Sequence, residues 1–209
     1  MSPNKPIKGT KPGQTHVTGL GGRSAAEFAR WYRSLALEQW EGLDLDAVAR
    51  LADWIVEAEK AGRTVWIMGN GGSAATASHM ATDLSKTASV PGRTQVRAIS
   101  VADNVAFITA IGNDLSFDDI FSRQLDNVLE KGDLVILISG SGNSPNLLKA
   151  AALAQSRGAR TAALLGFDGG KLKGAVDLAV LVASDQYGVI EDFHLSICHI
   201  LTFFLKQRK

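Results

Sequence analysis

The chain has 209 residues, 45% of them hydrophobic and 21% charged, and 22 basic residues nearly balance 21 acidic ones for a net charge of +1. This hydrophobic content excludes a wholly disordered chain, and the length suits one domain with a large core. The charge is uneven, because residues 1–23 contain four basic residues and no acidic one. The other 18 basic and 21 acidic residues give the rest a net charge of −3, which argues against binding along a nucleic-acid backbone.

We expect residues 1–23 to form a flexible basic tail and residues 24–209 to form a single domain. The lone cysteine, Cys198, excludes an internal disulfide and a multi-cysteine zinc site, and it fits a reducing compartment. The N-terminus lacks the apolar core of a signal peptide, and the most apolar stretch, 189–205, is interrupted by charged residues and histidines. We therefore expect a cytoplasmic protein that has neither a membrane nor a nucleic acid as a partner.

Two amphipathic helices are predicted between residues 24 and 63. Ser24 can cap the first helix, and Glu27, three residues further on, completes a capping box. This helix carries an apolar stripe at helical spacing, formed by Phe28, Trp31, Tyr32 and Leu35. After Gly42, Asp46 can cap a second helix with its own stripe. Two such helices cannot bury the aromatic stripe against each other, so a further surface is implied.

From Thr64 onward, short apolar runs alternate with helical segments. The runs cover 65–68, 96–100, 134–139, 161–165 and 178–182. They are continuous, as in strands buried on both faces of a parallel sheet. The helical segments between them cover 74–86, 104–111, 117–129 and 147–156. This order predicts an α/β fold with a doubly wound five-stranded parallel sheet. A final helix over about 189–206 is apolar nearly all round, which suggests burial between subunits.

Two of the predicted strands end in loops of small residues that open onto helices. Residues 69–73 read Gly-Asn-Gly-Gly-Ser, and residues 139–144 read Ser-Gly-Ser-Gly-Asn-Ser. Backbone amides at such strand ends can bind an anion, and the serine hydroxyls add neutral donors for a phosphate. The ordinary alternative is a pair of turns with capping serines. The first loop also fits the dinucleotide pattern G-x-G-x-x-A, but no acidic residue ends the next strand and no P-loop is present, so nucleotide binding is not expected.

Acidic and histidine side chains form the second candidate site. His79 and Asp83 are four residues apart and share a helix face, while Glu191, His194 and His199 lie on the last helix. Two histidines and two carboxylates can bind a divalent metal such as zinc, or can move a proton beside a carbonyl group. Each also has an ordinary explanation, with His194, for example, facing outward. His199 differs, because its apolar neighbours mean that it needs a partner.

Several motifs together resemble the sugar isomerase (SIS) domain family. They are 68–75 with His79, 112–114 with 117–123, 139–144, and 166–171. Within the family the sequence is most similar to the phosphoheptose isomerases, which interconvert sedoheptulose 7-phosphate and a heptose 7-phosphate. The resemblance covers roughly residues 24–206.

This resemblance implies a flavodoxin-like SIS fold, an aldose–ketose isomerase of a phosphorylated sugar, and a homotetramer with sites at subunit interfaces and bundled N-terminal helices. It implies substrate contacts from Asn70, Gly71, Gly72, Ser73, Asp114, Ser139, Gly140, Ser141 and Ser144. It implies one zinc ion per subunit on His79, Asp83, Glu191 and His199, and catalytic roles for Asp83, Glu191 and His199.

Some positions depart from the family pattern. Asp83 stands in place of a glutamate, Glu191 in place of a glutamine, Gly188-Val189 in place of an Asp-Arg pair, Thr76 in place of an aspartate and Thr87 in place of a basic residue. Because the altered acid/base groups remain ionisable, the pattern favours a working site with a changed substrate over an inactive one. Two alternatives stay open: an isomerase or binder of another phosphosugar, and a non-catalytic regulator similar to the DnaA-initiator-associating protein of the same family.

Overall fold

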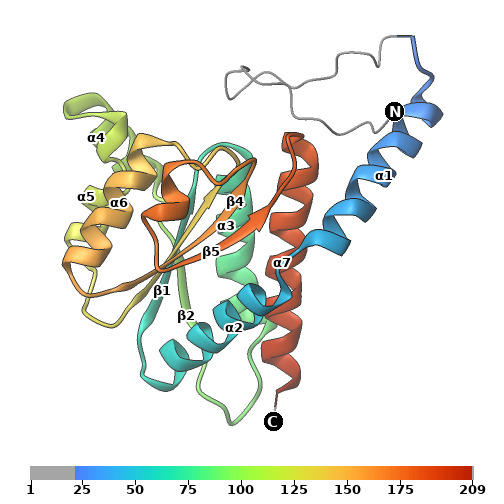
Figure 1. Cartoon of the computed structure of the whole chain (residues 1–209). Coiled ribbons are helices and arrows are strands. Elements are labelled where there is room, and N and C mark those ends of the chain that lie inside the picture. The colour runs from blue at the N-terminus through green and yellow to red at the C-terminus, as the bar shows by residue number, and fades with distance from the viewer. Residues whose placement is uncertain (1–21, 209) are drawn as a thin grey trace.

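Five parallel strands form one sheet in the computed structural model, which describes residues 22–208 (Figure 1). The strands are β1 (Thr64–Gly69), β2 (Arg97–Ser100), β3 (Leu134–Ser139), β4 (Arg160–Gly166) and β5 (Leu178–Val182). Their order across the sheet is β2-β1-β3-β4-β5. Every residue of β1 and β3 is buried, which explains why their sequences are continuous apolar runs. The predicted α/β fold with a five-stranded parallel sheet is confirmed.

The helices are α1 (Ala25–Gly42), α2 (Leu45–Lys60), α3 (Gly72–Thr82), α4 (Val105–Asp114), α5 (Ser122–Asp126), α6 (Pro145–Ser156) and α7 (Tyr187–Gln207). Three shorter segments are the π-helical η1 (Asp83–Thr87) and the 3-10 turns η2 (Phe117–Asp119) and η3 (Lys171–Gly174). The prediction of one helix over 117–129 was wrong. The Gln124 side chain donates to the Ile120 carbonyl at 2.8 Å, at the point where the continuous helix is interrupted.

Helices cover both faces of the sheet. Along β1, Val65 and Ile67 point into the core under α2, α3 and α7, whereas Trp66 and Met68 point into the core under α5 and α6. This alternation follows from the two-residue period of a strand. α3, which follows β1, and α6, which follows β3, therefore lie on opposite faces of the sheet (Figure 1).

The start of α1 confirms the predicted capping box, since Ser24 and Glu27 cap each other. The cap predicted for α2 was wrong by two residues: the Asp44 side chain accepts from the Ala47 amide at 2.9 Å, and Asp46 lies in the first turn. Of the described residues, α1 contributes none that is fully buried, and it projects away from the sheet (Figure 1). The apolar stripe therefore remains partly uncovered in a single chain. The predicted tail falls almost wholly on residues 1–21, which lie outside the described residues.

By length and composition alone, α7 is long and apolar enough to cross a membrane, but half of its most apolar stretch is buried inside the fold. It packs on α2, α3 and the sheet, which accounts for its composition. The helix is not buried on every side within one chain, because Ile200, Phe203 and Phe204 are 40–50% exposed. Its predicted burial between subunits stays a prediction.

Candidate functional site

The candidate site lies where the direction of chain connection changes in the sheet. β1 and β3 are neighbours, and the loops that leave their carboxyl ends lead to helices on opposite faces. Such diverging loops open a crevice at the edge of a parallel sheet, where ligands bind in doubly wound folds. The two loops of small residues, after β1 and after β3, are the ones that meet there.

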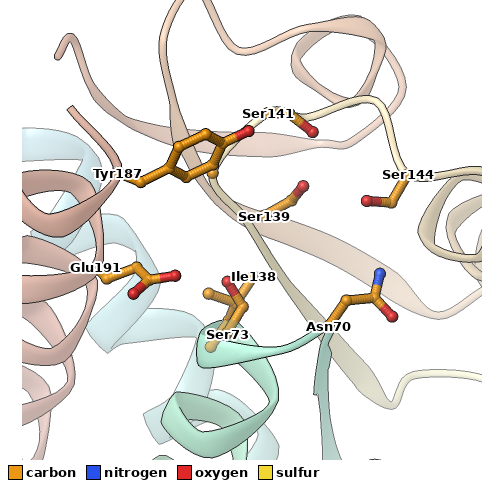
Figure 2. A pocket seen from close by; sticks show the side chains of 9 residues that line it. Asn70, Ser73, Ile138, Ser139, Ser141, Ser144, Tyr187 and Glu191 are labelled. Carbon is orange, nitrogen blue, oxygen red and sulfur yellow. The ribbon is translucent and has the colours of Figure 1, made fainter. Parts of the chain in front are cut away.

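A cavity of about 180 Å³ occupies this crevice (Figure 2). It is lined by Asn70, Ser73, Ile138, Ser139, Gly140, Ser141, Ser144, Tyr187 and Glu191. Six of these were predicted to bind substrate, and Glu191 was predicted to act in catalysis. Among these nine described residues, Glu191 carries the single charge, so an anion in the cavity would be held by hydroxyls and backbone dipoles.

The serine loop after β3 is held in shape by its own residues and by the loop after β4. The Ser139 hydroxyl accepts from the Gly142 amide at 3.0 Å, and the Asn143 side chain accepts from the Lys171 amide at 3.1 Å. A Cβ on Gly142, whose φ is +64°, would lie 2.0 Å from the Gly169 carbonyl oxygen, so this close contact requires glycine.

Ser144 is the N-cap residue of α6, but its side chain makes no capping hydrogen bond. Its hydroxyl lies at the rim of the cavity instead (Figure 2). Ser144 therefore does not act as a side-chain cap, and its hydroxyl is available to a ligand.

A reciprocal amide pair joins the two loops. Asn70 and Asn146 each donate a side-chain N–H to the other's carbonyl oxygen at 2.9 Å, and Asn146 is 1% exposed. The pair fixes the loop after β1 against the start of α6, and so fixes the width of the cavity. Asn146 was not predicted, because its partner is 76 residues away and no local pattern marks it.

Tyr187, the first residue of α7, forms a wall of the cavity that was also not predicted. Its ring packs edge-on against Phe167, with centroids 5.1 Å apart, and crosses Gly140, where a Cβ would lie 2.8 Å from the ring. Phe167 is the single non-glycine residue with positive φ, +51°, in the described part of the chain. Such backbone strain is concentrated at functional sites. The cavity wall is thus built from α7 and braced by the loop after β4.

A second group of side chains lies where η1 and α7 approach each other. His79 Nε2 is 3.2 Å from Asp83 Oδ2 and 3.3 Å from His199 Nε2, and His199 Nε2 is 3.9 Å from Asp83 Oδ2. His199 has a partner, as predicted, although its side chain is 42% exposed. Ligands about 2.1 Å from a tetrahedral zinc ion lie about 3.4 Å apart, so these three atoms fit a zinc site.

Four predicted site residues are placed differently from the prediction: Glu191 lines the cavity without joining the His-Asp-His group, and Gly71, Gly72 and Asp114 do not line the cavity. Glu191 lies outside the three-residue group, and its carboxylate lies against Gly72 at the start of α3, where a Cβ would be 2.5 Å from Oε1. Gly71 caps α3 with φ +56°, so Gly71 and Gly72 shape the site without lining the cavity. Asp114 ends α4, is exposed, and bonds to the Asn113 side chain rather than lining the cavity.

His194 belongs to the core and not to the site, which corrects the expectation that it faces outward. It is 0% exposed, and neither ring nitrogen has a hydrogen bond of normal geometry among residues 22–208. The nearby Leu165 carbonyl favours the protonated ring slightly, but burial dominates and lowers the pKa of His194 to about 4.

This burial predicts a loss of stability in mild acid. In the unfolded chain His194 has the ordinary histidine pKa of 6.5. Between pH 6.5 and about 4, the unfolded chain therefore binds a proton that the folded chain does not, and the free energy of unfolding decreases as the pH falls. From pH 7 to pH 5 the loss from His194 is about 2 kcal/mol. Urea unfolding at both pH values should show that His194→Leu removes most of this loss. Thr202→Val, a buried change on the same helix that does not titrate, should keep the wild-type loss. An equal acid loss in the His194→Leu variant would contradict the assignment.

Comparison with known proteins places the chain in one family. Residues 31–166 match the model of the SIS domain. The phosphoheptose isomerase of Trichlorobacter lovleyi is 41% identical over 174 residues, which cover 83% of this chain and 88% of that protein. A solved phosphoheptose isomerase structure from Francisella tularensis superposes with a TM-score of 0.81 at 29% identity, covering 88% of this chain and 96% of that one. One from Neisseria gonorrhoeae gives 0.79 at 29% identity, covering 88% and 97%. The chain therefore belongs to the SIS domain family and, within it, to the phosphoheptose isomerases.

Proposed function

We propose that this protein is an aldose–ketose isomerase that converts sedoheptulose 7-phosphate to a heptose 7-phosphate. The observation that carries the proposal is the pairing of a serine-lined cavity with a His-Asp-His group on the two helices, α3 with η1 and α7, that border it. The relatives named phosphoheptose isomerase support the same reaction and do not favour the regulator alternative.

The phosphate would lie on the serine loop. Ser139, Ser141 and Ser144 offer hydroxyls there, and the loop opens onto the N-terminus of α6, where helix dipoles favour an anion. Glu191 extends from α7 on the opposite side of the cavity from Ser144 (Figure 2). Repulsion between this carboxylate and the phosphate therefore favours a pose in which the sugar, not the phosphate, faces Glu191.

The extended length of the substrate is comparable with the axial distance from Glu191 to His199 along α7. α3 and α7 both begin at the cavity, and His199 lies eight residues, or about 12 Å, further along α7 than Glu191. An extended chain advances about 1.2 Å per bond, so seven carbons and their phosphate reach about 10 Å. A phosphate on the serine loop would then let the sugar extend past Glu191 toward the His-Asp-His group.

The reaction needs a proton moved between two carbons. Asp83, with Glu191 as the alternative base, takes the proton from C1 of the ketose, and the C1–H electrons form the C1=C2 bond of an enediol while the C2 carbonyl oxygen gains a proton. His199 donates the proton that O2 gains, and it takes the proton of O1 when the C1 carbonyl forms, so its own protonation state is restored. Return of the proton from the carboxylate base to C2 then gives the aldose, so no other reactant is consumed.

The same groups fit one zinc ion per subunit on His79, Asp83 and His199, with Glu191 as the fourth ligand if its side chain turns toward them. When bound, zinc would polarise the carbonyl oxygen of the sugar.

A homotetramer with sites at subunit interfaces would cover surfaces that one chain leaves open. Phe28 and Trp40 of α1 are 39% and 42% exposed, and α7 leaves three large apolar side chains uncovered. We propose a cytoplasmic location, because the lone Cys198 is free and buried. Nucleic acid and membrane have no role in this proposal.

Incubation of the zinc-loaded protein with sedoheptulose 7-phosphate in deuterated water, followed by NMR, tests the function. We expect the aldose to form and deuterium to appear on C1 or C2. Exchange with a hexose or pentose phosphate, but not with the heptose, would contradict the substrate and retain the reaction class. The isomerase proposal fails if no phosphosugar exchanges.

A further inference from the structure

Thr87 contacts Asp83 in a way that the isomerase chemistry does not by itself require. The Thr87 hydroxyl donates to Asp83 Oδ1 at 2.8 Å, and the pair is partly buried. Both residues belong to η1, the π-helical segment that continues α3, in which the Ala88 amide bonds back to the Asp83 carbonyl at 2.8 Å. π-Helical turns of this kind are rare and are often found at functional sites.

The two oxygens of Asp83 consequently have different roles. Oδ1 accepts the Thr87 hydroxyl, whereas Oδ2 faces His79 and His199 at 3.2 and 3.9 Å. The Asp83 side chain is 17% exposed, so water competes little for Oδ1. A hydroxyl holds the carboxylate without adding a positive charge beside it, so the full negative charge remains for a cation or for a proton acceptor.

We infer that Thr87 is a positioning residue that fixes the rotation of the Asp83 carboxylate and presents Oδ2 to the two histidines. The inference rests on the proposed function, since it assigns the preparation of that metal-binding and proton-accepting group to Thr87. Without the hydroxyl, the carboxylate rotates and must be ordered when zinc or substrate binds. Mutation of a residue that hydrogen-bonds to a metal ligand typically lowers metal affinity or activity by about 10- to 100-fold.

The experiment compares Thr87→Val, which keeps the shape and removes the hydroxyl, with Thr87→Ser, which keeps the hydroxyl. The matched control is Thr82→Val, which removes an exposed hydroxyl bonded to the Ser78 carbonyl on the same helix. Zinc affinity is measured by competition with a chromophoric chelator, the cobalt-substituted protein is followed by its visible spectrum, and kcat and KM are measured separately. Thermal melting of each variant checks that it folds.

We expect Thr87→Val to bind zinc about 10- to 100-fold more weakly, to alter the cobalt spectrum and to lower kcat with little change in KM. The zinc affinity and kcat of Thr87→Ser and Thr82→Val should stay within about threefold of the wild-type values. This is less than the effect expected when a metal ligand loses its hydrogen-bond partner. Wild-type zinc affinity and spectrum in a folded Thr87→Val variant would overturn the role of Thr87 alone. A wild-type protein that binds no zinc would overturn the metal site and this inference with it, whereas deuterium exchange tests the isomerase separately.

Discussion

Replacement of Asp83 by asparagine should lower kcat for sedoheptulose 7-phosphate isomerisation by about 10²- to 10⁴-fold, the usual contribution of a general acid or base. The amide has the same shape and can still accept the Thr87 hydroxyl bond, so the local fold should survive. It cannot take a proton from carbon, and it removes the negative charge from the group that faces His79 and His199. KM should change far less, because the phosphate would lie on the serine loop after β3 and not beside Asp83.

Steady-state kinetics on zinc-loaded protein measures this change. Asp53→Asn makes the same chemical change at an exposed position on α2 and should leave kcat unaltered. If Asp83→Asn keeps more than a tenth of wild-type kcat, Asp83 is not the base. Glu191→Gln separates the two carboxylates: a large loss in this variant together with a small one in Asp83→Asn would assign the proton transfer to Glu191.

The sheet could be predicted from sequence because its signal is local. Each central strand is buried on both faces, so each appears as an uninterrupted apolar run, and the run 134–139 coincides with β3. The edge strand β2 has the weakest pattern, with Ile99 40% exposed. Residues 117–129 were wrongly predicted as one helix, because apolar spacing does not reveal that the Gln124 side chain donates a hydrogen bond to the Ile120 carbonyl.

The site could be predicted only in part, because some of its contacts are local in the sequence and others depend on how the helices pack. His79 and Asp83 are one helical turn apart, which sequence spacing shows, but their contact with His199 depends on the packing of α3 against α7. His194 and His199 differ by five residues, or about 140° around a helix. The sequence alone cannot tell which of the two faces the core, because α7 is apolar on nearly all sides.

The second large effect is on stability, and it concerns Glu59, the buried acid near the end of α2. Its side chain is 2% exposed and pairs with Arg208, which follows α7, and with Arg93 Nε at 3.6 Å. Arg93 also donates to the carbonyls of Leu205 and Arg208 at 2.7 and 3.0 Å, so it satisfies acceptors at the end of α7. Glu59 therefore anchors the C-terminal end of α7 to α2.

Glu59→Ala should reduce the free energy of unfolding by about 3–5 kcal/mol, since it leaves two largely buried guanidinium groups without their carboxylate. For a chain of this size that corresponds to a fall in Tm of about 10 °C. Glu57→Ala is the matched control, the same substitution two residues earlier on α2, where an exposed ion pair with Arg160 contributes about 0–1 kcal/mol. Urea unfolding and calorimetry at one fixed protein concentration measure both variants, because oligomerisation would make Tm depend on concentration. Equal and small losses in the two variants would mean that water reaches the Arg93 and Arg208 guanidinium groups, and that apolar packing alone holds α7 in place.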